Sequence, residues 1–156
     1  MTATYDPKAI HVVIGGSLVS GYASDTFVRV KFNGNTMLQV VGCDGEVARI
    51  QSVDKTAFIE LILMQTAPFN QLLQLYAQLD RLNGGGIFTA SVKDTSGNII
   101  HSTPHAWVME VPEYAYGAKA GVRAWHLKCA SLDQDQVDDV QQPFTPPQFS
   151  GFSNLA

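Results

Sequence analysis

Two histidines in the segment HSTPH, His101 and His105, have the spacing of a metal-binding pair. Ligands four residues apart lie on one face of a helix, which is a common arrangement in zinc sites. Pro104 lies between them and interrupts a helix at that point. We therefore interpret both as surface histidines beside a turn.

The two cysteines are the other residues with reactive side chains. Either Cys43 or Cys129 could act as a nucleophile with His11 or His126 as the base, but no spacing in the sequence favours such a pair. Two cysteines are also too few for a disulfide framework and lack metal-ligand spacing. We expect reduced, partly buried thiols.

Two further segments resemble ligand-binding loops without matching them. The segment NGGG at 83–86 lacks the Gly-Lys-Ser/Thr ending of a phosphate-binding loop, and DQDQVDD at 133–139 lacks the central glycine and distant glutamate of a calcium loop. We interpret the first as a helix end and the second as a solvated acidic run. The sequence predicts no enzyme, no metal site and no cofactor.

Composition indicates a protein that contacts other protein surfaces rather than nucleic acid. Of its 156 residues, 46% are hydrophobic and 15% are charged, and the charged fraction is low against the usual quarter. Such a surface is typical of a subunit covered by copies of itself. The net charge is −4, and no basic patch is present that would bind phosphates. The whole imbalance comes from four aspartates, Asp133, Asp135, Asp138 and Asp139.

Neither terminus of the chain nor its interior carries a membrane signal. The N-terminus, MTATYDPKAI, has neither the basic nor the apolar region of a signal peptide. No apolar run approaches the ~20 residues of a membrane span. We expect synthesis and folding in a cytosol, without membrane insertion.

The first fifty residues read as strands joined by glycine turns. Apolar runs at 10–14 and 18–22 are separated by Gly15-Gly16, which permits a tight hairpin. The run at 27–32 alternates between apolar and polar residues, and NGN at 33–35 turns the chain into the run at 36–41. These patterns predict a meander or a Greek key.

A long hairpin is predicted over 47–64, with Asp54-Lys55 as its two-residue loop. This register places Arg49 opposite Glu60 as a cross-strand charge pair. One face is then apolar, formed by Ala48, Ile50, Ala57, Ile59, Leu61 and Leu63. The other face is mixed, formed by Val47, Arg49, Gln51, Phe58, Glu60 and Ile62. The mixed face requires either a second subunit or partial exposure, and we favour the subunit.

A single helix is predicted at about 67–83, where the apolar period changes to that of an amphipathic helix. Thr66 is the expected cap, Pro68 suits an early helical position, and Asn83-Gly84 ends the helix. Strands resume beyond it. We expect two parts, a β domain at 1–132 and an acidic tail at 133–156. The tail contains Phe144, Phe149 and Phe152, which either dock on a partner or belong to a loose terminus.

The order of these motifs resembles a known family. YDPKAIHVVIGGSLVSGYASDTFVRV, followed by GCDGEVARIQSVDKTAFIELILMQTAPFNQLL, is similar to the tail tube proteins of contractile-tailed bacteriophages. The resemblance runs from about Asp6 to Leu132, and the QTAPFN junction is its most specific part. Phe69 departs from the family, where a small serine is frequent.

The resemblance implies a mainly β fold, a β-sandwich or rolled β-barrel with one flanking helix. Six copies would form a ring with a continuous inner β-barrel, and rings would stack into the tube that conducts DNA without sequence-specific binding. The tail sheath would surround it, with baseplate and tail terminator at its ends. The protein would be made in the bacterial host cytoplasm and reside in the virion tail. The alternatives are the tube of a contractile bacteriocin or type VI-like device, and a monomeric β-sandwich binding module.

The channel and the contacts between subunits are the expected functional regions. A conduit for a polyanion should not bind it, because each neutralised phosphate adds affinity. We therefore expect a channel of neutral or negative potential. The candidates for the subunit interface or channel wall are Arg29, Lys31, Arg49, Gln51, Asp54, Lys55, Phe58 and Glu60.

Overall fold

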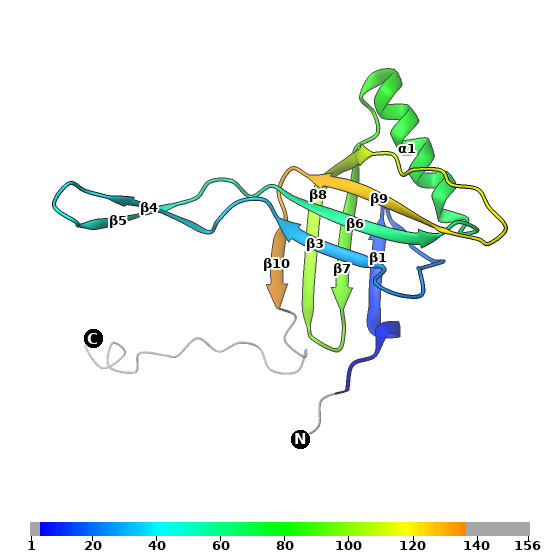
Figure 1. Cartoon of the computed structure of the whole chain (residues 1–156), viewed down its shortest axis with the longest axis horizontal. Coiled ribbons are helices and arrows are strands. Elements are labelled where there is room, and N and C mark those ends of the chain that lie inside the picture. Colours follow the sequence, from blue (N-terminus) through cyan, green and yellow to red (C-terminus); the bar gives the residue numbers. More distant parts are fainter. Residues whose placement is uncertain (1–3, 137–156) are drawn as a thin grey trace, which may run out of the picture.

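The computed structural model describes residues 4–136 and shows strands with one α-helix (Figure 1). After a short 3₁₀ helix, Pro7–Ala9, the strands are β1 (Ile10–Ile14), β2 (Ser17–Leu18), β3 (Val28–Phe32), β4 (Met37–Val41), β5 (Val47–Gln51), β6 (Ala57–Met64), β7 (Phe88–Asp94), β8 (Ile99–Glu110), β9 (Val122–Cys129) and β10 (Asp133–Gln136). The helix α1 spans Phe69–Asn83. The expected mainly β fold with one flanking helix is confirmed.

One antiparallel sheet of eight strands forms the body. Its order is β2-β1-β7-β8-β9-β6-β3, and β10 pairs with β8 beside this path. The long strand β8 connects two layers, since residues 99–106 pair with β7, residues 99–102 also pair with β10, and residues 106–110 pair with β9. In Figure 1, β3, β6 and β9 cross in front of β1, β7 and β8. The sheet is therefore rolled around its core.

The bend of β8 lies at Thr103–His105. The Thr103 hydroxyl accepts a hydrogen bond from the His105 backbone N–H at 3.3 Å, and Pro104 between them removes a ladder donor. Register shifts in the β7–β8 and β8–β9 pairs flank the bend. Bulges of this kind turn a strand from one layer into the next.

The core lies between the two layers and alternates along each strand as period two requires. Inward residues of β6 are fully buried, and their outward neighbours are half-buried. Trp125 is the largest side chain that is completely enclosed. The core side chains from the strands are Val12, Ile14, Ala57, Ile59, Leu61, Leu63, Phe88, Ala90, Val92, Ala106, Trp125, Leu127 and Cys129.

The helix closes one end of this rolled sheet. It buries Phe69, Leu73 and Ala77, and the Tyr76 ring packs on Phe88 with centroids 4.7 Å apart. Gly84 ends it in the left-handed conformation, as expected. The expected cap is wrong, because the helix starts after Pro68 without a side-chain cap.

The register predicted for 47–64 is also wrong. β5 pairs with β4, where Arg49 lies opposite Gln39, and Glu60 on β6 lies opposite Arg29 on β3. The segment 52–56 connects β5 of the two-stranded β4–β5 sheet to β6 of the eight-stranded sheet and is not a turn within one hairpin. The apolar half on β6 is buried as predicted, whereas Ala48 and Ile50 are exposed.

The C-terminal end of the sheet extends past the expected boundary at residue 132. β10, Asp133–Gln136, pairs with β8 instead of leaving the sheet. The remaining residues of the expected tail, including its three phenylalanines, lie outside the described residues. The division into a domain and a tail stays a prediction.

Candidate assembly surfaces

A two-stranded arm, formed by β4, β5 and their GCDG turn, projects from the body (Figure 1). Its turn is closed by the Gly42 N–H donating to the Glu46 carbonyl at 2.7 Å. All ten strand residues are exposed. Val41 and Val47, opposite each other near the tip, are each 60% exposed.

The two faces of the arm differ in polarity. Residues directly opposite in an antiparallel pair share a face. Leu38 with Ile50 and Val40 with Ala48 therefore make one entirely apolar face. On the other face, Gln39 lies opposite Arg49 and Met37 opposite Gln51, with the valine pair at the tip.

Such an arm is not expected to persist alone in water. Isolated two-stranded hairpins are marginally stable, and proteins rarely leave an apolar strand pair uncovered. Leu38 and Ile50 remain 47% exposed although they contact each other across the arm. The apolar face requires a partner.

A second surface is the outer face of β3, β6 and β9, which we call the open sheet face. Arg29 lies beside Glu60, with 3.4 Å between guanidinium and carboxylate, and Lys31 lies opposite Phe58. On the far side of β6, Lys128 is also opposite Phe58. The Arg29 side chain is 62% exposed, so this ion pair contributes little stability, on the order of 0–1 kcal/mol.

The sequence-predicted interface residues thus fall into three groups. Arg29, Lys31, Phe58 and Glu60 come together on the open sheet face, and Arg49 and Gln51 lie on the arm. Asp54 and Lys55 belong to the connection between the arm and β6.

The base of the arm is shaped by the Asp54 carboxylate. It accepts hydrogen bonds from the Thr56 N–H at 2.9 Å and the Thr56 hydroxyl at 2.6 Å. These bonds lower the pKa of Asp54. With Gln51 and Lys55, Asp54 lines a hollow of about 290 Å³ beside the start of β10. The local bonds set the direction in which the arm leaves the body.

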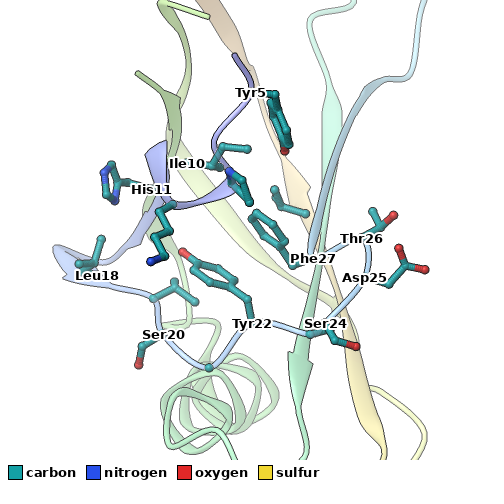
Figure 2. A pocket seen from close by; sticks show the side chains of 16 residues that line it. Tyr5, Ile10, His11, Leu18, Ser20, Tyr22, Ser24, Asp25, Thr26 and Phe27 are labelled. Atoms are coloured by element: carbon teal, nitrogen blue, oxygen red, sulfur yellow. The ribbon is translucent and has the colours of Figure 1, made fainter. Parts of the chain in front are cut away.

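A groove of about 750 Å³ lies between the two open borders of the rolled sheet, near β1 and β3 (Figure 2). Its apolar residues include Tyr5, Ile10, Leu18 and Phe27, and Leu18 is 61% exposed. Lys8 and Asp25 are its charged residues, and His11 is its histidine. In Figure 2, His11 and Asp25 stand on opposite walls.

Tyr22 forms the floor of this groove. The Val12 N–H donates to its hydroxyl at 3.3 Å, and the ring lies 4.7 Å from Phe27. Burial raises the pKa of Tyr22. Gly21, with φ of 81°, precedes it and approaches Ala67 closely. These contacts hold Tyr22 against β1, while the outer edge of β3 has no partner strand within residues 4–136.

The residues considered for chemistry are scattered. Cys43 is exposed at the arm tip and Cys129 is buried, and both thiols are free. His101 is half-buried on β8 and its Nδ1 has no partner, whereas His105 is exposed. Within residues 4–136, no three or more His, Cys, Asp or Glu side chains gather as a metal site would need. No helix in the same range is long and apolar enough to cross a membrane.

Sequence reasoning missed the arm and the groove. A signal for the arm existed, because two strand-forming runs of equal length flank the four-residue GCDG turn. The groove had no comparable signal, since its lining residues all lie within 5–28 but share no period that would mark a hollow.

The arrangement of strands places the chain in a known structural class. No family model matches it. It is 25% identical over 132 residues to the structural protein ORF10 of Pseudomonas phage KPP10, covering 80% of this chain and 76% of the phage protein. The protein is thus related to a structural protein of a phage.

Two solved structures define the fold class. The tube-terminating cap of the anti-feeding prophage superposes with a TM-score of 0.61 at 12% identity, covering 87% of this chain and 95% of the cap. A chain of the sheath–tube complex of an extracellular contractile injection system, PVC, superposes with a TM-score of 0.61 at 11% identity, covering 86% and 93%. The fold is that of tube and terminator proteins of contractile injection systems.

Proposed function

We propose that this protein is the subunit of a phage tail tube of the contractile type. Six copies form a ring, rings stack into a tube, and DNA passes through the channel. The observation that carries the proposal is the arm, because its apolar face stays exposed in a single copy. The relationship to a phage structural protein and the tube-like fold support it.

The energetics of the arm favour assembly. Fully burying a large aliphatic side chain is worth roughly 1.5–3 kcal/mol. Leu38 and Ile50 are each about half covered already, so their remaining exposed area is worth roughly 2 kcal/mol per arm. Val40, at 53% exposed, adds to this. A ring sums this contribution over every subunit contact, which suits an obligate interface.

In this proposal the open sheet face turns toward the channel or a neighbouring subunit, with Arg29, Lys31, Phe58 and Glu60 on it. Arg49 and Gln51 on the arm, with Asp54 and Lys55 at its base, belong to the contact between copies. The neutral or negative channel stays a prediction. Lys31 and Lys128 are the residues that would overturn it if they lined the channel unpaired, since only Arg29 has an acidic partner on this face within residues 4–136.

The partners in this proposal are those of a tail: sheath around the tube, with baseplate and terminator at its ends. The protein acts as a structural component without catalysis and is assembled in the host cytoplasm. The experiment is size-exclusion chromatography with negative-stain microscopy of purified protein. Rings or tubes with a central hole are expected. A stable monomer at high concentration would overturn the proposal in favour of a β-sandwich binding module.

A matched pair of variants tests the role of the arm. Leu38→Ser with Ile50→Ser removes the apolar face, and Gln39→Ser with Arg49→Ser alters the opposite face at equivalent positions. The first is expected to remain monomeric with an unchanged circular dichroism spectrum, because neither residue belongs to the core. The second should assemble more readily than the first. Equal assembly of both would contradict the role assigned to the apolar face.

Two other functions have specific support. The similarity to a terminating cap equals that to the sheath–tube complex, with TM-scores of 0.61 in both cases. Gold-labelled antibodies on particles would distinguish a tube subunit from a cap. Antibodies against a tube subunit would bind along the exposed length of the contracted tail, and antibodies against a cap would bind only at its end. The tube of a bacteriocin or secretion-type injection device would yield tailed particles without capsids or DNA.

A further inference from the structure

We propose that the apolar face of the arm of one copy docks in the groove between β1 and β3 of a second copy. This inference rests on the proposed function, because it names the contact that joins tube subunits. The two surfaces are separate parts of one chain, on different sides of the body (Figure 1).

The apolar face of the arm and the groove match in shape and polarity. The apolar face presents Leu38, Val40 and Ile50, and the groove presents Leu18 and Phe27 in a concave space of about 750 Å³. The open sheet face, by comparison, has charges on both sides of Phe58 and β6 side chains that are already half-buried. Of these two surfaces, the groove is the concave and apolar one.

Charge complementarity then indicates the orientation. The arm tip carries Asp44 and Glu46, and the groove is lined by Lys8 and by His11, which stands on one wall. Asp25 on the opposite wall would then pair with Arg49, which lies farther from the tip of the arm. Opposite charges of this kind fix the register of a contact more than its affinity.

Unpaired strand edges give a second reason. β1 offers little free edge, because the Val12 N–H donates to the Tyr22 hydroxyl and the Val12 carbonyl accepts from the Val19 N–H, so β3 supplies the open border. The outer edge of β3 has no partner strand within residues 4–136. A hairpin has two free edges of its own and can add to such borders by backbone hydrogen bonds. Docking would therefore satisfy edges on both copies.

The contact is head-to-tail, because arm and groove are different surfaces. A heterologous contact closes into a ring when its rotation divides a full turn and otherwise builds a filament. Repeating this one contact therefore arranges many identical copies in the same orientation.

Native Cys43 at the arm tip provides the test, since it is exposed while Cys129 is buried. Single cysteines are placed at Lys8→Cys and Ser24→Cys in the groove, Lys31→Cys on the open sheet face and Gln74→Cys on the helix. Assembled full-length particles are treated with a short bismaleimide and analysed by gel and peptide mass spectrometry. All four positions are exposed in a single copy.

The expected result is a linked ladder for Lys8→Cys that disappears when Cys43→Ser is added. Ser24→Cys should link less, because the acidic tip is placed at the opposite wall. The inference is overturned if Lys31→Cys or Gln74→Cys links as strongly as Lys8→Cys. It is also overturned if assembled particles give no groove linkage, as would happen if residues 137–156 or a foreign segment filled the groove.

A charge exchange provides a second measurement. Lys8→Glu should raise the protein concentration needed for assembly severalfold, and Asp44→Lys in the same chain should restore it. If the exchange does not restore assembly, the proposed orientation of the arm in the groove is wrong. Microscopy distinguishes failure of the docking from failure of the proposed function. Rings without groove linkage refute the docking alone, whereas persistent monomers refute the proposed function.

Discussion

The junction between β6 and α1 contains a buried hydrogen-bond network whose removal should be costly. The Trp125 indole N–H donates to the Asn70 Oδ1 at 2.9 Å, and the Asn70 amide donates to the Met64 carbonyl at 3.0 Å and the Gln65 carbonyl at 3.4 Å. Trp125 is fully buried and Asn70 is 5% exposed. Removing the Asn70 side chain would leave this enclosed indole N–H without its protein acceptor.

The predicted cost of Asn70→Ala follows from these bonds. An unsatisfied buried donor costs roughly 1–3 kcal/mol, and a lost amide–carbonyl bond adds about 1 kcal/mol. The Met64 carbonyl keeps a second donor, the Ala67 N–H at 2.9 Å, which limits the loss there. We expect a decrease of about 3 kcal/mol in the free energy of unfolding, which is roughly a 150-fold change in the folding equilibrium.

Urea denaturation followed by tryptophan fluorescence and circular dichroism measures this change, at one protein concentration for all variants. Gln74→Ala, on the exposed side of the same helix, should change stability by less than ~0.5 kcal/mol. A double-mutant cycle with Trp125→Phe isolates the pair, and a coupling of about 1–2 kcal/mol is expected. A loss below about 1 kcal/mol for Asn70→Ala, or no measurable coupling, would refute the reasoning.

Three further outcomes are expected. Gly21→Ala should cost more than ~1 kcal/mol in a thermal or urea melt, because φ of 81° disfavours a side chain and the new methyl would meet Ala67; an unchanged midpoint would contradict this. Burial raises the pKa of Cys129 to about 11, so iodoacetamide at pH 8 should label Cys43 alone in native monomer and both thiols after unfolding, as counted by intact mass. Desolvation lowers the pKa of His101, so below about pH 6.5 the unfolded chain binds more protons than the folded chain. The free energy of unfolding should therefore fall as pH drops below about 6.5. His101→Gln should reduce this dependence of stability on pH in melts between pH 5 and 7.

Local sequence patterns predicted the elements whose apolar residues recur with a clear period. The helix appears within two residues of its expected start because its apolar spacing and Gly84 are local signals. The inward face of β6 was predicted for the same reason, since alternation assigns faces regardless of which strand lies beside it. Resemblance to a family supplied the overall architecture, which alternation alone left open.

Strand pairing was predicted wrongly where it depended on a loop. Treating Asp54-Lys55 as a turn pairs Arg49 with Glu60, whereas the folded chain places Arg29 there. The GCDG turn instead pairs β4 with β5, and it is closed by Gly45 at φ of 87° and by the bond from the Gly42 N–H to the Glu46 carbonyl. Once β5 leaves β6, its apolar face has no cover within residues 4–136, and the arm results.

The groove could not be predicted because it depends on tertiary geometry. Lys8, Leu18 and Asp25 have no shared period, and each alone resembles an ordinary surface residue. They meet because β2 with β1 at one end and β3 at the other are the borders of a sheet that rolls without closing. No local pattern reports how far a sheet rolls.

A head-to-tail contact that builds along an axis leaves one unsatisfied surface at each end. Here the last copies would present either bare arms or empty grooves, and both are apolar. Such an end must be covered, and a protein of the same fold that offers only the complementary surface would cover it without adding a new one. A cap and a chain of a sheath–tube complex both superpose on this chain with a TM-score of 0.61, so both share its fold. The physical difference between a tube subunit and its terminator then reduces to whether both surfaces, arm and groove, are free to bind.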